Sequence, residues 1–208
     1  TALLFQDING GPSGDPTRIQ DVTINGTTGV GSHGIEFSQT GGSLTGNFLF
    51  DGIEINNTSG DAIHIDGGAA SITMLIQDAA IPANTITNNA GYSLNIQNNS
   101  GVVTLGQLAI EDDGGDGILI QNSSAEITIG ANSQGDTALL TNTPGTPVEI
   151  LDLDGSVTFL GPITIEDPGD IGIDIQGLGP EGPNFAGRVD FLGPVSITGR
   201  GDIGINVV

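Results

Sequence analysis

Apolar residues recur along the chain in a fixed frame. One apolar residue is followed eight positions later by a second and two positions after that by a third, with Asn, Asp and Gly in between. Six copies of this frame occupy residues 55–65, 86–96, 110–120, 140–150, 165–175 and 197–207, and a seventh at 24–37 has three extra turn residues. Apolar and polar positions that alternate among Ile, Val and Thr predict short strands separated by turns.

A further set of short alternating segments follows most copies of the frame. Its members are residues 71–74, 102–105, 126–129, 156–159 and 188–191, and the shorter segments 3–5 and 48–50 fit the same pattern. Equivalent positions in consecutive copies lie between 24 and 32 residues apart, so the loops absorb insertions while the strands keep their phase. No window sustains the i, i+3, i+4 spacing of a helix, and a sandwich would need hairpin turns.

These observations predict an all-β fold, a right-handed, three-sided parallel β-helix (β-solenoid) of about seven coils. We expect residues 1–208 to form a single domain, which is a segment or repeat unit of a longer or self-stacking solenoid. The chain begins with Thr, which also indicates an excised piece of a longer protein.

The run "EDDGGD" at 111–116 raises the question of a metal loop. An Asn or Asp stands two residues past the strand end in five copies, at Asn57, Asn88, Asp112, Asn142 and Asp167. Because a side-chain amide can donate to one coil and accept from the next, we interpret this column as a stacked corner. The glycines further along the turn are expected to take positive φ; they are Gly60, Gly91, Gly115 and Gly145.

Charge and composition exclude several classes of protein. The chain has a formal net charge of -22, with only three Lys and Arg residues in total and no Cys. Nucleic-acid binding depends on clustered Lys and Arg, so we expect no nucleic-acid partner. No apolar run approaches the ~20 residues that cross a bilayer, so we expect no membrane insertion. An acidic surface suits salt-rich surroundings or divalent cations.

The units "GDAIHI", "GDGILI" and "SVTFLGPITI" resemble the right-handed parallel β-helix superfamily, the pectin-lyase-like fold. Within it, the chain is most similar to the non-enzymatic repeats of large bacterial surface proteins and autotransporter-like adhesins. The resemblance covers nearly the whole chain. It implies the fold and an extracellular or cell-surface location, but the same scaffold hosts lyases, hydrolases, tailspikes and adhesins.

Candidate catalytic residues do not form a family pattern. In the pectin hydrolases of this superfamily an Asp-Asp pair precedes Gly-His-Gly, whereas here His33 precedes Asp112 and Asp113, and no Lys completes the set. We expect Arg18 and Arg188 in loops, and His33 and His64 as lone surface residues. The prediction is therefore a non-enzymatic protein with no assigned catalytic, cofactor-binding or metal-binding residue.

Asp170 and Asp202 are expected at the same turn position of two successive coils. A bound cation would relieve the repulsion between the two carboxylates, so calcium is the one cofactor considered. A row of threonines is expected to face the solvent: Thr73, Thr104, Thr128 and Thr158. An ice-binding face needs a second outward Thr in each coil, and this row lacks it. Four phenylalanines are expected in the core: Phe48, Phe50, Phe159 and Phe191.

The expected function is that of an extracellular shaft or filament subunit of a cell-surface protein, adhesin or fibre. The segment 3–5 is assigned to the further set of strands that follows the frame, and 205–207 to the strand that closes the frame, which would make the two ends complementary in phase. We expect end-to-end self-association or continuation of the same solenoid. The alternative is a carbohydrate-binding or carbohydrate-processing β-helix, with a surface polysaccharide contacted by the loops 38–47, 77–83, 130–137 and 176–187.

Overall fold

A computed structural model represents the protein. It describes residues 1–75, 84–87, 89–106, 108–111, 116–130, 138–141, 143–178, 187–199 and 202–208. These residues form strands and turns without a helix. Accordingly, the described part of the chain has no helix long and apolar enough to span a membrane.

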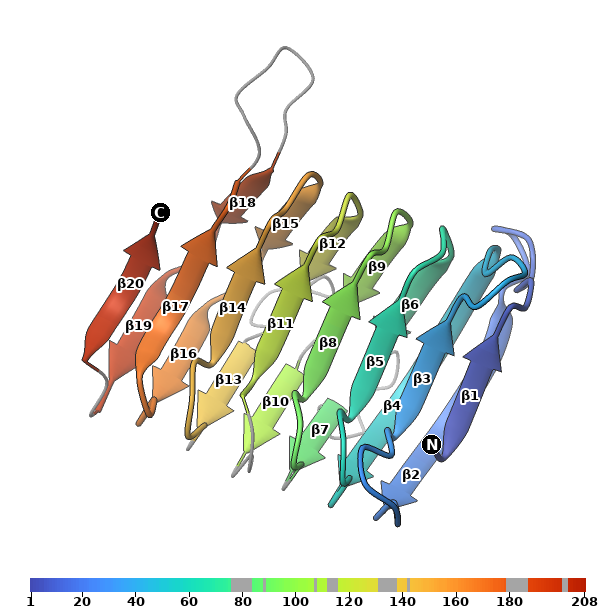
Figure 1. The fold of residues 1–208 in the computed structure, drawn as a ribbon, viewed down its shortest axis with the longest axis horizontal. Helices are drawn as coiled ribbons and strands as arrows, with labels where there is room; N and C mark the ends of the chain where they lie inside the picture. The colour runs from blue at the N-terminus through green and yellow to red at the C-terminus, as the bar shows by residue number, and fades with distance from the viewer. Residues whose placement is uncertain are drawn as a thin grey trace.

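Eight strands form the first sheet, which we call sheet A. In spatial order they are β1 (Leu3–Gln6), β3 (Ile35–Ser38), β5 (Ile63–Asp66), β8 (Leu94–Gln97), β11 (Ile118–Gln121), β14 (Val148–Leu151), β17 (Ile171–Gln176) and β20 (Ile203–Val207). Every neighbouring pair is parallel. Figure 1 shows the sheet from its outer side, with its strands in chain order from β1 to β20.

The second sheet supplies the two remaining sides of the solenoid. Side B contains β6 (Ser71–Leu75), β9 (Val102–Leu105), β12 (Glu126–Ile129), β15 (Ser156–Phe159) and β18 (Arg188–Phe191). Side C contains β7 (Asn84–Thr87), β10 (Leu108–Glu111), β13 (Ala138–Thr141), β16 (Ile163–Glu166) and β19 (Val195–Thr198). Two long strands, β2 (Thr17–Asn25) and β4 (Asn47–Asn56), pass through both sides.

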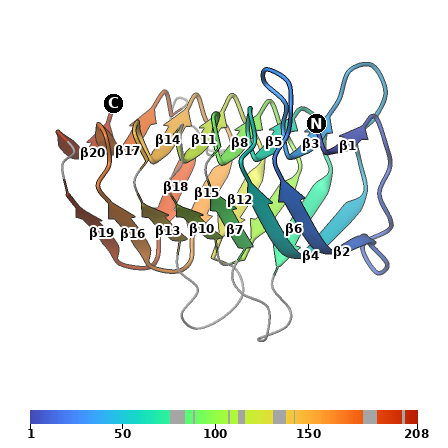
Figure 2. The same cartoon turned by 90° about the horizontal axis from the view of Figure 1, so that it is seen from below.

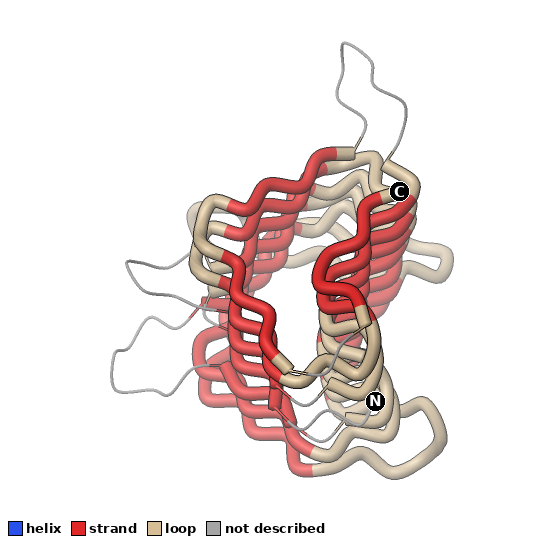
Figure 3. The backbone as a smooth tube through the Cα atoms, turned by 90° about the vertical axis from the view of Figure 1, so that its left-hand side faces the viewer, coloured by secondary structure: helices blue, strands red, loops and turns tan. Residues whose placement is uncertain are grey.

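The long strands bend where a residue takes positive φ, at Asp21 (φ 51°) in β2 and Gly52 (φ 76°) in β4. The first half of β4 pairs with β6 and its second half with β7, so the strand turns the corner between sides B and C. Viewed along the axis, the strands enclose the core on three sides (Figure 3), and the view from below separates sheet A from the other strands (Figure 2).

The predicted fold class, an all-β parallel β-solenoid, is confirmed. About five turns consist of three separate strands each, from β5–β7 to β17–β19, against the seven coils expected. The difference is small and has a structural reason. In the turns before β5, one bent strand, β2 or β4, replaces the separate strands of sides B and C.

One strand assignment was wrong. Residues 3–5 pair with Ile35–Phe37 of sheet A, with Leu3 opposite Ile35 and Phe5 opposite Phe37. The first and last strands, β1 and β20, therefore lie in the same sheet, and the expected phase complementarity of the ends does not hold. Three alternating residues fit either side of a solenoid, and the stacked rings of Phe5 and Phe37, 4.6 Å apart, accompany the observed register.

The core consists of apolar rows that run along the solenoid axis. In sheet A one row contains six side chains that are at most 3% exposed: Ile35, Ile63, Leu94, Ile118, Val148 and Ile173. Each large side chain contributes ~1.5–3 kcal/mol of gross burial before conformational entropy is subtracted. Phe48, Phe50 and Phe159 are fully buried, and Phe191 packs against the core in a stack with Phe159, as predicted.

The corners obey two different constraints. After sheet A, positive φ recurs on most coils, at Asp7, Gly67, Asn98, Asn122, Asp152 and Gly177. Between side C and sheet A it occurs at Asn57 and Asp167 of the predicted column; Asn88, Asp112 and Asn142 lie outside the described residues. Gly, Asn and Asp tolerate this conformation best, which explains why they mark the corners.

The prediction of positive φ at Gly60, Gly91 and Gly145 was wrong, and Gly115 is not among the described residues. Glycine is required there by close approach instead. A Cβ on Gly60 would lie 2.7 Å from the backbone of Gly31 on the neighbouring coil. A Cβ on Gly91 would likewise overlap the carboxylate and the backbone of Asp61, whereas at Gly145 the overlap is with the Asp116 carboxylate alone, a side chain that can move aside.

Candidate functional site

Chemically distinctive side chains gather on the outer face of sheet A. The outward residue in the middle of each strand forms a column in register: Leu4, Glu36, His64, Asn95, Leu119, Glu149, Asp174 and Asn206. Beside it, the residues just before each strand form a second column: His33, Asp61, Tyr92, Asp116 and Thr146. We call these two columns the outer stripe.

Two histidines and an aspartate converge at one end of the outer stripe. His64 Nδ1 lies 2.7 Å from Asp61 Oδ2, and His33 Nδ1 lies 3.5 Å from the same oxygen. The two imidazole rings are stacked, with centroids 4.4 Å apart and planes 14° from parallel. All three side chains are largely buried, with exposures of 22% for His33, 10% for Asp61 and 17% for His64.

Hydrogen bonds fix the Asp61 carboxylate. The backbone N–H of Tyr92 donates to Oδ1 at 2.9 Å, and the Asn95 amide donates to Oδ2 at 2.8 Å. The backbone N–H of Asp61 donates to His33 Nδ1 at 3.1 Å, so that nitrogen carries a lone pair and no proton. The carboxylate is thus held from the next coil by Tyr92 and Asn95, while its own backbone orients a histidine on the preceding coil.

Protonation differs between the two histidines. Burial, followed by the charge of His64, holds the pKa of His33 below its ordinary value. Burial also acts to lower the pKa of His64, but the hydrogen bond to Asp61 and that carboxylate's charge outweigh it and leave the pKa raised. For Asp61, burial acts to raise the pKa, yet the hydrogen bonds it accepts keep the pKa below its ordinary value. The cluster therefore favours a His64–Asp61 ion pair beside a neutral His33.

The middle of the outer stripe holds a tyrosine among carboxylates. Tyr92 Oη lies 3.4 Å from Glu149 Oε2, and Asp116 Oδ1 accepts the backbone N–H of Thr146 at 3.1 Å. Burial raises the pKa of Asp116, and burial together with the Asp116 charge raises that of Glu149. Burial and the Glu149 charge raise the pKa of Tyr92 to about 12.

Near the far end of the outer stripe, the carboxylate of Asp174 has hydrogen-bond partners for both of its oxygens. Asp174 is 5% exposed and accepts hydrogen bonds from the side-chain amides of Gln176 at 2.6 Å and Asn206 at 2.8 Å. Both partners donate neutral hydrogen bonds to its two oxygens. This arrangement explains a buried acid on structural grounds alone.

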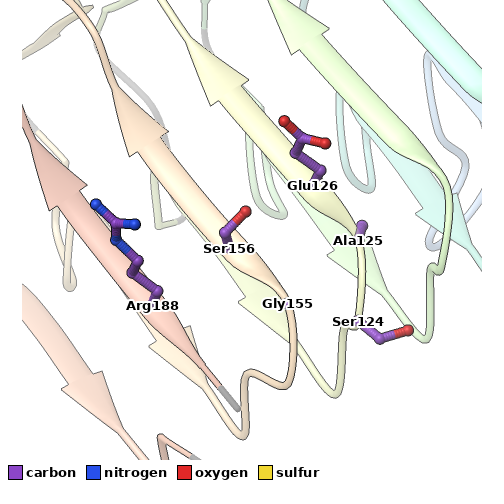
Figure 4. A pocket seen from close by; sticks show the side chains of 6 residues that line it. All are labelled: Ser124, Ala125, Glu126, Gly155, Ser156 and Arg188. Atoms are coloured by element: carbon purple, nitrogen blue, oxygen red, sulfur yellow. The ribbon is translucent and has the colours of Figure 1, made fainter. Parts of the chain in front are cut away.

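A shallow surface pocket of about 310 Å³ lies away from the outer stripe, where the strands β12, β15 and β18 of side B begin (Figure 4). Glu126, Ser156 and Arg188 occupy one register position on successive strands, so the short serine leaves a depression between two long side chains. Arg188 is 63% exposed and pairs with Asp190 at 2.7 Å. The expectation that Arg18 and Arg188 lie in loops was wrong, because they belong to β2 and β18.

The other predicted positions have mixed outcomes. Asp170 and Asp202 do lie on adjacent coils, where the backbone N–H of Asp202 donates to the carbonyl of Asp170 at 3.2 Å, and both are exposed. Asp112 and Asp113 lie outside the described residues. The threonine row is in register, with Thr73 opposite Thr104, Thr104 opposite Thr128 and Thr128 opposite Thr158.

The interpretation of His33 and His64 as lone residues was wrong. In the sequence, His33 stands two residues before Ile35 and Asp61 two residues before Ile63, with His64 directly after. Superposing the copies "SHGIEF" and "GDAIHI" places His33 beside Asp61 on the neighbouring coil. This alignment would have predicted that His33 and Asp61 are neighbours. The three extra residues in the turn of the first copy made the alignment hard to recognise.

The fold and the outer stripe define a parallel β-solenoid that carries a row of polar and ionisable side chains on one sheet. No family model matches this chain, and no curated protein or solved structure matches it. The class is thus established by the strand topology itself.

Proposed function

We propose that the protein is a non-enzymatic, extracellular β-helix that serves as a shaft or filament subunit of a cell-surface protein, adhesin or fibre. The observation that carries this proposal is the uninterrupted stacking of coils around continuous apolar rows. Such a solenoid is stiff along its axis, because each coil contacts only its neighbours and continues their hydrogen-bond ladders. We further assign it to the pectin-lyase-like superfamily, near the repeats of bacterial surface proteins and adhesins.

The composition supports this function. A net charge of -22 keeps the rods apart and soluble in a salt-rich exterior. The chain has no Lys and three Arg, which leaves few sites for trypsin-like proteases.

Although the first and last strands lie in the same sheet and the ends do not match in phase, we also propose that the partner along the axis is more of the same solenoid, as a continuing chain or a second copy. Apolar side chains of the last strand face no further coil, with Ile203 48%, Ile205 49% and Val207 63% exposed. Among the described strands β20 pairs with β17 on one side only, and its other edge presents free backbone groups that another parallel strand can pair with.

Negative-stain electron microscopy of residues 1–208, with and without calcium, tests the axial partner. Self-stacking predicts long, thin, unbranched rods that disappear in Ile205→Lys, which places a charge at the end of a core row. Val30→Lys is the matched control, because Val30 is fully exposed in a turn. Short particles for every variant would exclude self-assembly and leave a segment of a longer shaft. In a separate activity assay, turnover of a polysaccharide would contradict the non-enzymatic function.

A second function is favoured by one observation, the tyrosine among protonatable carboxylates on the outer stripe. Carbohydrate-binding surfaces combine an aromatic ring with carboxylates that accept hydroxyl protons. Isothermal titration with acidic and neutral surface polysaccharides would detect such binding. A loss in Tyr92→Ala, with retention in Thr158→Ala on side B, would support this alternative, and equal heats for both variants would remove it.

A further inference from the structure

The His33, Asp61 and His64 side chains form a compact set of potential metal ligands. One ligand atom from each lies within 4.8 Å of the others. The set spans two neighbouring coils, since His33 precedes β3 and His64 belongs to β5. Partial burial limits competition from water, which distinguishes this cluster from the exposed Asp170 and Asp202 pair.

The donor set selects the kind of ion. Two imidazole nitrogens and one carboxylate suit Zn²⁺ and neighbouring transition metals, whereas Ca²⁺ takes six to eight oxygen ligands. The chain contains no cysteine and only these two histidines, so it has no other nitrogen or sulfur set of this type. We propose that His33, Asp61 and His64 bind a divalent transition-metal ion, for which Zn²⁺ is the probe, and that the ion links two adjacent coils.

The distances are close to those that a metal needs. With Zn–ligand bonds of ~2.0–2.1 Å in tetrahedral geometry, ligand atoms lie ~3.3–3.4 Å apart. The separation between His33 Nδ1 and Asp61 Oδ2 is 3.5 Å. The 2.7 Å between His64 Nδ1 and Asp61 Oδ2 is a hydrogen-bond distance and must widen when the metal replaces the proton.

Binding also requires the rings to turn. Nitrogen lone pairs lie in the plane of the imidazole ring, so the lone pairs of the two stacked histidines lie in separate, nearly parallel planes and do not both point at one ion. Rotation about the Cβ–Cγ bond is a soft motion for histidine, and it lets the two lone pairs converge. His33 Nδ1 then exchanges the backbone N–H of Asp61 for the metal.

The surroundings orient the carboxylate for this role. Tyr92 and Asn95 donate to its two oxygens, as the outer partners of metal ligands commonly do. Glu36 of β3 lies directly beside His64 of β5 in the strand register. It is the carboxylate next to His64 in the outward column of sheet A. Water or Glu36 completes the coordination.

The first test uses the native chain. Because it has only two histidines, their ring-proton NMR signals are resolved markers. The proposal predicts that both signals shift and saturate at one equivalent of Zn²⁺, that Ca²⁺ leaves them in place, and that Co²⁺ gives an absorption spectrum with nitrogen ligation. Zn²⁺ at about 100 times its dissociation constant should raise Tm by about 5–10 °C.

Variants then locate the site. His64→Gln retains a polar side chain and should weaken Zn²⁺ binding at least tenfold and abolish the rise in Tm. Glu166→Gln, on an exposed position of side C, is the matched control and should bind like the native chain. If His64→Gln does not fold, the NMR titration of the native chain decides alone. Unshifted histidine signals at one equivalent, or equal binding by both variants, would overturn the proposal.

Discussion

Replacement of Gly155 by alanine tests the coil spacing on which the fold depends. Gly155 lies at the corner between sheet A and side B, directly against the preceding coil. A Cβ built there lies 2.6 Å from the carbonyl carbon of Ser124, 2.8 Å from the nitrogen of Ala125 and still closer to the Ala125 carbonyl oxygen. Cβ atoms essentially never approach other heavy atoms to less than 3.0 Å, and the obstacle here is backbone, which cannot rotate away as a flexible side chain can.

The cost follows from the bonds that must stretch. Gly155 N–H donates to the Ser123 carbonyl at 3.0 Å, and the Gly155 carbonyl accepts from Arg188 N–H at 3.0 Å. Weakening two or three ladder bonds costs about 1 kcal/mol each, and overpacking typically costs about 1–3 kcal/mol. We expect a loss of about 2–4 kcal/mol in the free energy of unfolding, or roughly 5–15 °C in Tm for a chain of this size.

Thermal unfolding followed by circular dichroism near 218 nm measures the effect. Gly41→Ala is the matched control, because a Cβ at Gly41 meets nothing within 4 Å and its φ is not in the left-handed region. Its Tm should change by less than about 2 °C. Equal Tm values for Gly155→Ala and Gly41→Ala would refute the close stacking of coils at this corner.

The remaining predictions concern the core, a corner and a titration. Ile127→Ala, at a fully buried position of β12, should cost about 2–5 kcal/mol in chemical denaturation, and a loss below 1 kcal/mol would mean that the row is not packed. Asn122 takes φ 48°, so Asn122→Val should lose about 1–2 kcal/mol while Asn122→Gly stays within about 0.5 kcal/mol; the reverse order would contradict the left-handed corner. Tyr92 is the only tyrosine and there is no Trp, so absorbance near 295 nm should give its pKa directly, at about 12. Since that pKa is raised above the ordinary 10.0, the contribution of the protonated phenol is complete below pH 10 and is lost as pH rises toward 12. Ionisation near pH 10 in the folded protein would exclude the burial of Tyr92 beside Glu149.

The strands could be predicted because their signal is local. Period-two alternation places Ile118 and Ile120 inward, and the constant phase of the copies then fixes the pairing with β8 and β14. The same argument predicted the threonine row from Thr73 to Thr158. Parallel stacking leaves no freedom of register once the turn lengths are known.

The misassigned features depend on contacts between coils. Residues 3–5 have the same alternation in either sheet, and only their partners on β3 decide between them. Gly60 is needed because Gly31 approaches it from another coil, which the turn sequence itself does not reveal. His33 and Asp61 are 28 residues apart and meet only when an insertion in the first turn is placed correctly.

Distance measurement by double electron–electron resonance tests the central claim, a regular stack of parallel coils, most directly. The chain contains no cysteine, so spin labels can be placed at single introduced cysteines without background. Glu36, Glu149 and Asn206 share one outward column of sheet A, and four and six coils separate the second and third from the first. At ~4.8 Å per coil, the pair 36/149 should lie about 19 Å apart and the pair 36/206 about 29 Å apart, each with a narrow distribution. Distances that are broad, or that do not grow in proportion to the number of coils, would contradict the solenoid and the shaft function built on it.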